Sequence, residues 1–346
     1  CAIVTKVRVA GLCAEALEGV LSPCTDRTMT MAGDPPDVDQ LLAEDIADNA
    51  TMEWDPERFR FIGTLQEAPR NSGYVELCED LHLHHRVAVK AMPRSWTCDS
   101  HQEFLVTHAD ENELPWRDIA AIRYLSQKRG LHCICQFIGL FSRNSEAKGA
   151  EICLVLSYCS GGDLFSWLEA SVISTKCERE TLARIFMRKV LNSVQQVHSC
   201  GIAHGDLSLE NILLQHEEKN PDLAEVRLID FGACTGARGQ GLRGKPSYQA
   251  PEVHLCDEYD AFAADMFSLG VMAFTLAVGN YPWRSTRPFV CPCWKFHSQH
   301  GLQLYLAKRR VRVGDEVSSL AAVLSPSFID FLSALLCVDP VQRISL

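Results

Sequence analysis

The sequence lacks the features that place a protein in a membrane or on a nucleic acid. No run of eighteen apolar residues occurs, so we expect no helix that spans a bilayer. Basic residues are in deficit, with 33 Lys and Arg against 44 Asp and Glu and a formal net charge of −11. A negative surface favours basic partners and disfavours nucleic acid. With 346 residues and 47% hydrophobic content, the chain can still bury a large core.

Cysteine is abundant, but its spacing lacks the pattern of a structural metal site. The sixteen cysteines are scattered, and a disulfide framework would be unusual in a chain with so much apolar content. The Cys-x-Cys pairs at 133–135 and 291–293 lack the gap of two to four residues found in zinc knuckles. His297 and His300 follow the second pair, so a metal there is the minor alternative. Buried, unreactive thiols are the main expectation.

The most informative stretch is HGDLSLENILL at residues 204–214, which places an Asp and an Asn five residues apart before a short apolar strand. A hydroxyl that attacks a phosphate needs a carboxylate to orient it and accept its proton, and Asp206 would be that group. Phosphates bridged by Mg²⁺ need a neutral oxygen ligand nearby, and Asn211 supplies an amide oxygen. The spacing therefore predicts a phosphoryl-transfer loop.

Other motifs occur in a fixed order around this loop. Upstream, VAVK at 87–90 would carry Lys90 on a strand to nucleotide phosphates, and downstream RLIDFG ends an apolar strand at Asp230, a second metal ligand. Three further motifs follow: APE at 250–252, DMFSLGV at 265–271 and DPVQR at 339–343. Such an ordered series is not expected by chance.

On these motifs the chain resembles the eukaryotic protein kinases from about residue 57 onward. The resemblance implies an α+β fold of two lobes with ATP and Mg²⁺ between them. A small β-rich lobe with one main helix would span residues 57–156, and a larger α-helical lobe would span 157–346. Residues 1–56 would be an extension that is disordered or partly helical, with a helix near 38–49. We expect the chain to be a fragment that stops at the family's last motif.

The resemblance also assigns the nucleotide-binding residues. Leu156 would be the gatekeeper, 157–159 the hinge with Ser157 and Cys159, and Asp163 the ribose contact. The remaining assigned contacts are Gly73, Val75, Ala88 and Leu213.

Lys90 is expected to pair with an acid on the main helix of the small lobe. Apolar residues at helical intervals predict that helix over 114–128. The family register selects Asp118, which is one methylene shorter than the usual Glu. Glu113, one turn earlier, is the alternative.

The loop over the nucleotide departs from the family pattern Gly-x-Gly-x-x-Gly-x-Val. Counting back from Lys90 without gaps places Gly73 and Val75 in register, but the loop reads APRNSGYV and the first two glycines are Ala68 and Arg70. Pro69 has no amide hydrogen and a fixed φ, so the loop cannot cover phosphates as a glycine loop does. Arg70 would either replace the lost amides or be solvated, and we favour the solvated alternative. In this respect the chain looks most like apicomplexan FIKK kinases and secreted kinases without a glycine loop.

Two residues that would lie beside the ATP phosphates occupy each other's usual positions. Most Ser/Thr kinases have a Lys two residues after the catalytic Asp and a Thr seven residues before the Glu of APE, whereas this chain has Ser208 and Lys245. Our hypothesis is that Lys245 stabilises the transferring phosphoryl group while Ser208 holds the geometry. The alternative is that Lys245 is a surface residue of the substrate platform. Gly205 replaces an Arg that usually neutralises a phosphorylated activation segment, which favours constitutive activity.

These features predict a Ser/Thr protein kinase, because LSLEN lacks the patterns of tyrosine kinases. Asp163 and Glu210 stand where basic-directed kinases contact substrate arginines, so basic protein substrates are expected. A pseudokinase that acts as a scaffold is the alternative, favoured by the lost glycines and the short Asp118. A small-molecule phosphotransferase is disfavoured by the large-lobe motifs. The compartment, cytoplasmic or secreted by a parasite, and the oligomeric state are not indicated.

Overall fold

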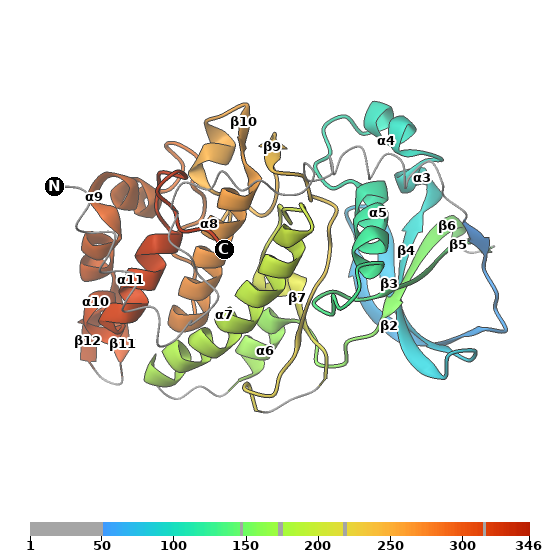
Figure 1. Cartoon of the computed structure of the whole chain (residues 1–346), viewed down its shortest axis with the longest axis horizontal. Coiled ribbons are helices and arrows are strands. Elements are labelled where there is room, and N and C mark those ends of the chain that lie inside the picture. The colour runs from blue at the N-terminus through green and yellow to red at the C-terminus, as the bar shows by residue number, and fades with distance from the viewer. Residues whose placement is uncertain (1–50, 146–147, 172–175, 217–219, 314–315) are drawn as a thin grey trace.

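The computed structural model describes residues 51–145, 148–171, 176–216, 220–313 and 316–346. The helix expected near 38–49 lies outside the described residues. A lobe built on a β-sheet and a larger helical lobe lie side by side (Figure 1). The α+β fold with two lobes is therefore confirmed.

The small lobe is built on a six-stranded sheet in the order β1-β5-β6-β4-β3-β2. Its strands are β1 (Met52–Glu53), β2 (Phe59–Ala68), β3 (Gly73–Asp80), β4 (His85–Pro93), β5 (Phe137–Ser145) and β6 (Gly149–Ser157). Its helices are α3 (Arg94–Thr97), α4 (His101–Thr107) and the longer α5 (Pro115–Ser126). Side chains alternate along β4, so Val87 and Val89 are buried on one face while Lys90 points to the other. This alternation turns Lys90 toward α5.

The opposite face of the sheet has a small core of its own, with Phe59, Phe141 and Val155 among its members. Strand β1 pairs in parallel with β5, and Trp54 stacks on Phe59 with ring centroids 4.6 Å apart. Residues 52–54 precede the expected start of the lobe, yet they pack as part of its sheet. The sheet therefore begins with a short strand upstream of residue 57.

A buried network of charges lies on the same face as this core. The guanidinium of Arg143 donates to Glu151 (2.9 Å), Glu76 (2.8 Å) and the hydroxyl of Tyr74 (2.8 Å). Tyr74 in turn donates to Glu151 at 2.6 Å. Glu151 is only 1% exposed, so the hydrogen bonds from Arg143 and Tyr74 must compensate its buried negative charge in place of water.

The described residues of the large lobe are mainly helical, with three small two-stranded sheets. Its α-helices are α6 (Leu164–Ala170), α7 (Lys176–Ser199), α8 (Ala261–Val278), α9 (Pro292–Lys308), α10 (Leu320–Val323) and α11 (Pro326–Leu335). The paired strands are β7 (Ile212–Leu214) with β8 (Val226–Leu228), β9 (Arg238–Gln240) with β10 (Glu258–Asp260), and β11 (Arg310–Val313) with β12 (Glu316–Ser319). Helix α8 is long and apolar enough to cross a membrane by composition, but 72% of it is buried inside the lobe. It is the central core helix.

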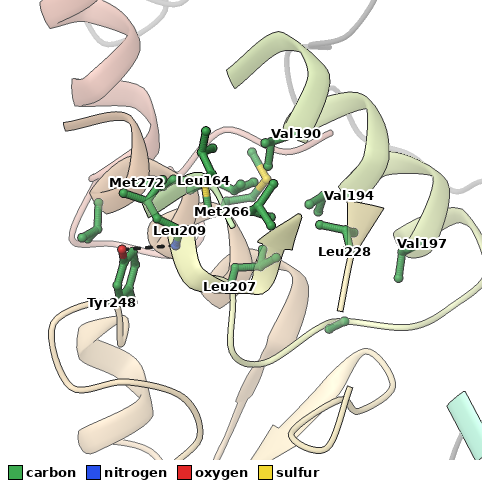
Figure 2. Packing of buried hydrophobic residues seen from close by; sticks show 14 of the residues in the cluster. Leu164, Val190, Val194, Val197, Leu207, Leu209, Leu228, Tyr248, Met266 and Met272 are labelled. Carbon is green, nitrogen blue, oxygen red and sulfur yellow. Dashed lines mark hydrogen bonds between the residues drawn. The ribbon is translucent and has the colours of Figure 1, made fainter. Parts of the chain in front are cut away.

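The core of this lobe supports the loop at residues 204–214 (Figure 2). Val190, Val194 and Val197 of α7 follow one helical face and are buried beneath the loop. Leu207 and Leu209 of the loop are fully buried in the same cluster. The loop is therefore anchored by apolar side chains on either side of Ser208.

The Cys-x-Cys pair at 291–293 does not form a metal site with the nearby histidines. His297 is stacked on Trp283, and its ring nitrogen Nε2 donates to the carbonyl of Leu336 at 3.3 Å. Burial lowers the pKa of His297 to about 4, so it packs as a neutral ring. Among the described residues no group of three or more potential ligands could hold a metal ion.

The Arg143 network yields a test of stability. Arg143→Met should lower the free energy of unfolding by about 3–5 kcal/mol, because Glu151 would be left buried with an uncompensated charge. Arg60→Met is the matched control, since Arg60 pairs with Glu79 at the surface and is 66% exposed. The control should change stability by less than about 1 kcal/mol. Equal effects of the two variants in urea unfolding would contradict the structural role given to Arg143.

Candidate active site

A lysine and two carboxylates join the two lobes. The ammonium of Lys90 lies 2.7 Å from Asp118 Oδ2 and 3.3 Å from Asp230 Oδ1. The other oxygen of Asp118 accepts the backbone N–H of Phe231 at 2.8 Å. Lys90 thus pairs with Asp118, and a hydrogen bond of ordinary length forms despite the missing methylene. Strand β4, helix α5 and the turn after β8 meet at this carboxylate.

The opposite charges of Lys90 and Asp230 each stabilise the ionised form of the other side chain. Removal from water would lower the pKa of Lys90, but Asp118, Asp230 and Glu113 raise it overall. Lys90 lowers the pKa of Asp230 against the opposing effect of burial. Asp230 has φ +65°, which is uncommon for a residue other than glycine and typical of functional sites. Asp230 therefore carries an ionised carboxylate at the junction of the two lobes.

Asp206 is held from both sides. Asn211 Nδ2 donates to the backbone carbonyl of Asp206 at 2.8 Å and to its Oδ2 at 3.1 Å, and the N–H of Lys245 donates to Oδ1 at 3.0 Å. The amide nitrogen of Asn211 thus faces Asp206, which directs the amide oxygen the other way. Burial raises the pKa of Asp206, although His204 and Lys245 act to lower it.

The backbone around Asp206 is fixed by a buried carboxylate of α8. Asp265 accepts the N–H groups of His204 (2.7 Å) and Gly205 (3.0 Å). The ring of His204 contacts the carbonyl of Ile229 at 3.0 Å, which ties the loop to the residue before Asp230. Gly205 has φ +77°, and a Cβ there would lie 2.3 Å from the carbonyl oxygen of Ala233. Only glycine fits this position.

The two residues that look exchanged in the sequence are in contact. Lys245 Nζ donates to Ser208 Oγ at 2.9 Å and lies 3.2 Å from Glu210 Oε2. Ser208 is fully buried, whereas the side chain of Lys245 is 39% exposed. Lys245 is therefore not a free residue of the surface, because its backbone and its side chain both contact the loop that carries Asp206.

The protein kinase domain family matches residues 71–346. This chain belongs to the protein kinase family. Maternal embryonic leucine zipper kinase of Xenopus tropicalis is 34% identical over 202 residues, which cover 56% of this chain and 26% of that protein. Human serine/threonine-protein kinase ULK1 is 33% identical over 145 residues, 40% of this chain and 13% of that protein. Probable serine/threonine-protein kinase 2 of Plasmodium falciparum is 35% identical over 134 residues, which cover 38% of this chain and 25% of that protein. The chain spans about a quarter or less of these relatives.

The residues that the kinase resemblance assigns to the nucleotide are joined through strand pairing. Val75 pairs with Lys90, and Ala88 pairs with the expected gatekeeper Leu156. The hinge begins where Ser157 accepts the N–H of Gln136 at 2.9 Å. Two cysteines meet beside it, with the sulfur atoms of Cys159 and Cys135 3.5 Å apart. Leu213 and Asp163 form an isolated antiparallel β-bridge.

Both acids expected to meet basic substrates already have partners inside the kinase. Asp163 begins α6 and accepts the N–H and the hydroxyl of Ser166 at 2.8 and 2.7 Å. Glu210 pairs with Lys245. A basic substrate or a ribose would therefore have to share or displace these contacts. Helix caps and ion pairs between loops were the part of the site that sequence reasoning missed.

The turn between β2 and β3 differs from a glycine loop. It bends back on itself, because the N–H of Asn71 bonds the carbonyl of Ala68 at 3.2 Å and Asn71 Oδ1 accepts the N–H of Gly73 at 2.9 Å. Arg70, which we expected to be solvated, has 57% of its side chain exposed and also forms ion pairs with Glu111 and with Glu113, the latter at 3.4 Å.

The activation segment, from Asp230 to Glu252, is held by contacts within itself and with neighbouring parts of the large lobe. Strand β9 pairs with β10, and Ala203 and Thr235 exchange backbone hydrogen bonds of 2.8 and 3.0 Å. Arg243 donates to the carbonyls of Ala233 and Gln240, at 3.1 Å each. These backbone and guanidinium contacts fix the path of the segment from Ala233 to Gln240.

Other motif residues also find partners that their spacing did not predict. Glu252 of APE and Arg343 of DPVQR form a buried, two-pronged ion pair with distances of 2.5 and 3.0 Å. The hydroxyl of Tyr248 accepts the N–H of Leu209 at 3.3 Å, as the dashed line in Figure 2 shows. The order of the motifs was the only signal for these contacts.

Gly205 offers a test of the catalytic-loop geometry. Gly205→Ala should lower the free energy of unfolding by about 2–5 kcal/mol, because it adds a clash with the Ala233 carbonyl to the cost of the left-handed backbone. Gly130→Ala is the control, since Gly130 has φ +79° and open space around it. The control should cost about 1–2 kcal/mol. Similar losses for both variants in denaturant unfolding would show that no close approach exists at Gly205.

Proposed function

We propose that this chain is a Ser/Thr protein kinase that transfers the γ-phosphate of ATP to hydroxyls of protein substrates. The observation that carries the proposal is Asp206, whose carboxylate is held by Asn211 and by the N–H of Lys245 in the loop that also approaches Asp230. Relatives named as serine/threonine kinases support an active enzyme rather than a scaffold.

The donor set fits Mg²⁺ and a triphosphate. Asp230 is an ionised carboxylate and Asn211 has an amide oxygen, the ligand types that Mg²⁺ prefers. Lys90 would bind the α- and β-phosphates, with Asp118 holding its ammonium in place. When bound, Mg²⁺ neutralises charge on the phosphates. Asp206 would orient the acceptor hydroxyl and take its proton.

The nucleotide base and ribose would lie against residues of both lobes. Leu156 would be the gatekeeper, Ser157 and Cys159 hinge residues, and Asp163 the ribose contact. The other proposed contacts are Gly73, Val75, Ala88 and Leu213. We also propose that this chain belongs with the kinases that lack a glycine loop, such as the FIKK group, because Ala68 and Arg70 stand where the first two glycines would be.

Lys245 would stabilise the transferring phosphoryl group. Its ammonium is positioned by Ser208 at 2.9 Å, and the same residue's N–H binds Asp206. A cation fixed beside developing negative charge lowers the barrier because no reorganisation is needed during the reaction. The pair would do the work of the Lys and Thr that most Ser/Thr kinases have in reversed positions.

Label transfer from radioactive ATP with Mg²⁺ to a mixture of Ser/Thr peptides tests the main proposal. The wild-type chain should label peptides, with basic peptides labelled best. Asp206→Asn should lower the rate by about 10²–10⁴-fold because the proton acceptor is lost. Asp230→Ala should also be impaired, whereas Asp257→Ala changes an exposed acid and should retain full transfer. Equal transfer by wild type and Asp230→Ala would refute the kinase assignment.

The charge of Lys245 predicts a pH effect. The turnover number should fall as the pH drops through the pKa of Asp206, since only the ionised carboxylate accepts a proton. Lys245 lowers that pKa, so Lys245→Met should move the acid limb of the profile to higher pH. The turnover number at neutral pH should fall by about 10²–10³-fold.

Lys245→Arg keeps the charge and should largely preserve the position of the acid limb. Lys189→Met removes a half-buried lysine of α7 that contacts the carbonyl of Asp222, and it should leave the profile unchanged. If Lys245→Met has the wild-type turnover number and acid limb, Lys245 is only a surface residue of the substrate platform.

A further inference from the structure

The turn that replaces the glycine loop is preorganised. Pro69 fixes one φ angle, Ser72 has φ +56°, and Asn71 closes the turn with the side-chain bond to Gly73. The backbone amides at its tip are therefore turned inward in part, and Arg70 is the cation that the tip presents.

Arg70 connects this tip to the segment between α4 and α5. One guanidinium nitrogen pairs with Glu111 and another lies 3.4 Å from Glu113. These contacts join residues 41 and 43 positions apart in the sequence. A planar guanidinium can bind two carboxylates at once, which a lysine ammonium does with less directional control.

Glu113 stands next to the turn that carries Asp230. The N–H of Leu114 donates to the carbonyl of Gly232 at 3.1 Å, and a Cβ on Gly232 would lie 3.1 Å from Glu113 Cγ. Burial raises the pKa of Glu113 and so does Asp230, whereas Lys90 and Arg70 lower it. Arg70 therefore supplies counter-charge at the edge of the Lys90 and Asp230 site.

We propose that Arg70 is a positioning residue that clasps the β2–β3 turn to Glu111 and Glu113 and so closes the turn over the triphosphate of the nucleotide. The clasp takes the place of the backbone amides that a glycine loop would supply. It rests on the proposed function, because ATP is the ligand that the closed turn would retain.

The clasp is weak in each contact and effective in combination. Arg70 is 57% exposed, so each of its ion pairs contributes little and is screened by salt. The turn is already rigid, so few further backbone or side-chain torsions become ordered when it closes. Little of the interaction free energy is therefore offset by lost conformational entropy. The clasp should therefore act on nucleotide affinity and be sensitive to ionic strength.

Nucleotide binding to the whole chain tests the proposal without any phosphoryl transfer. The probe is a non-hydrolysable, fluorescently labelled ATP analogue with Mg²⁺, followed by fluorescence anisotropy at low and high salt. Arg70→Ala should raise the Kd about three- to tenfold at low salt, and the difference should shrink near 1 M salt. Arg60→Ala is the control, because Arg60 pairs with Glu79 within the sheet and should leave the Kd unchanged.

A charge exchange separates a clasp from a direct contact with phosphate. Arg70→Glu should weaken binding further, and adding Glu111→Arg should restore much of the affinity. In the nucleotide-free protein, Arg70→Ala should also speed hydrogen exchange at the amides of residues 70–73, with the thermal midpoint nearly unchanged.

Two results would overturn the clasp. One is a wild-type Kd for Arg70→Ala at low salt. The other is a double variant no better than Arg70→Glu alone, which would mean that Arg70 acts on the nucleotide itself. If the wild-type chain binds no nucleotide, the proposed function fails and the clasp fails with it. Binding by wild type with no effect of Arg70→Ala defeats the clasp alone.

Discussion

One buried carboxylate organises the junction between the lobes. Asp118 is 1% exposed, and each of its oxygens has a donor from a different part of the chain, the ammonium of Lys90 and the amide of Phe231. An unpaired charge at this depth would cost several kcal/mol. Strand β4, helix α5 and the turn that carries Asp230 are therefore joined through this one side chain. The position of the two charges that would face the nucleotide follows from this one side chain.

The loop that carries Asp206 depends on a second carboxylate in the same way. Asp265 lies in the buried helix α8 and binds two successive amides of the loop, at His204 and Gly205. The loop is thus fixed to the least exposed part of the large lobe, while His204 reaches across to Ile229 beside the Asp230 turn. Asp206 sits between these supports. Rigidity at the site comes from the cores of both lobes rather than from the loops themselves.

The fold could be predicted from the sequence because its motifs carry their chemistry locally. A strand with Lys90, a loop with Asp206 and Asn211, and a turn with Asp230 require little beyond spacing, and the family comparison agrees with that reading. The pairing of β1 with β5 and the ion pairs of Arg70 were not predictable, because neither leaves a periodic pattern. The same holds for the cap formed by Asp163. The spacing of Ser208 from Asp206 and of Lys245 from the Glu of APE revealed that the two residue types are exchanged. Their contact could be found only in the folded chain.

Gly205 also limits how this kinase could acquire a new form of control. Where the protein kinase motif has an arginine at this point, that side chain can bind a phosphate on the activation segment. Here the carbonyl of Ala233 occupies the space that any side chain would need. Introducing that arginine by a single substitution would displace the segment it is meant to hold. Sensitivity to phosphorylation at this point therefore requires coordinated changes in two segments, which makes it difficult to reach by stepwise evolution or by simple protein engineering.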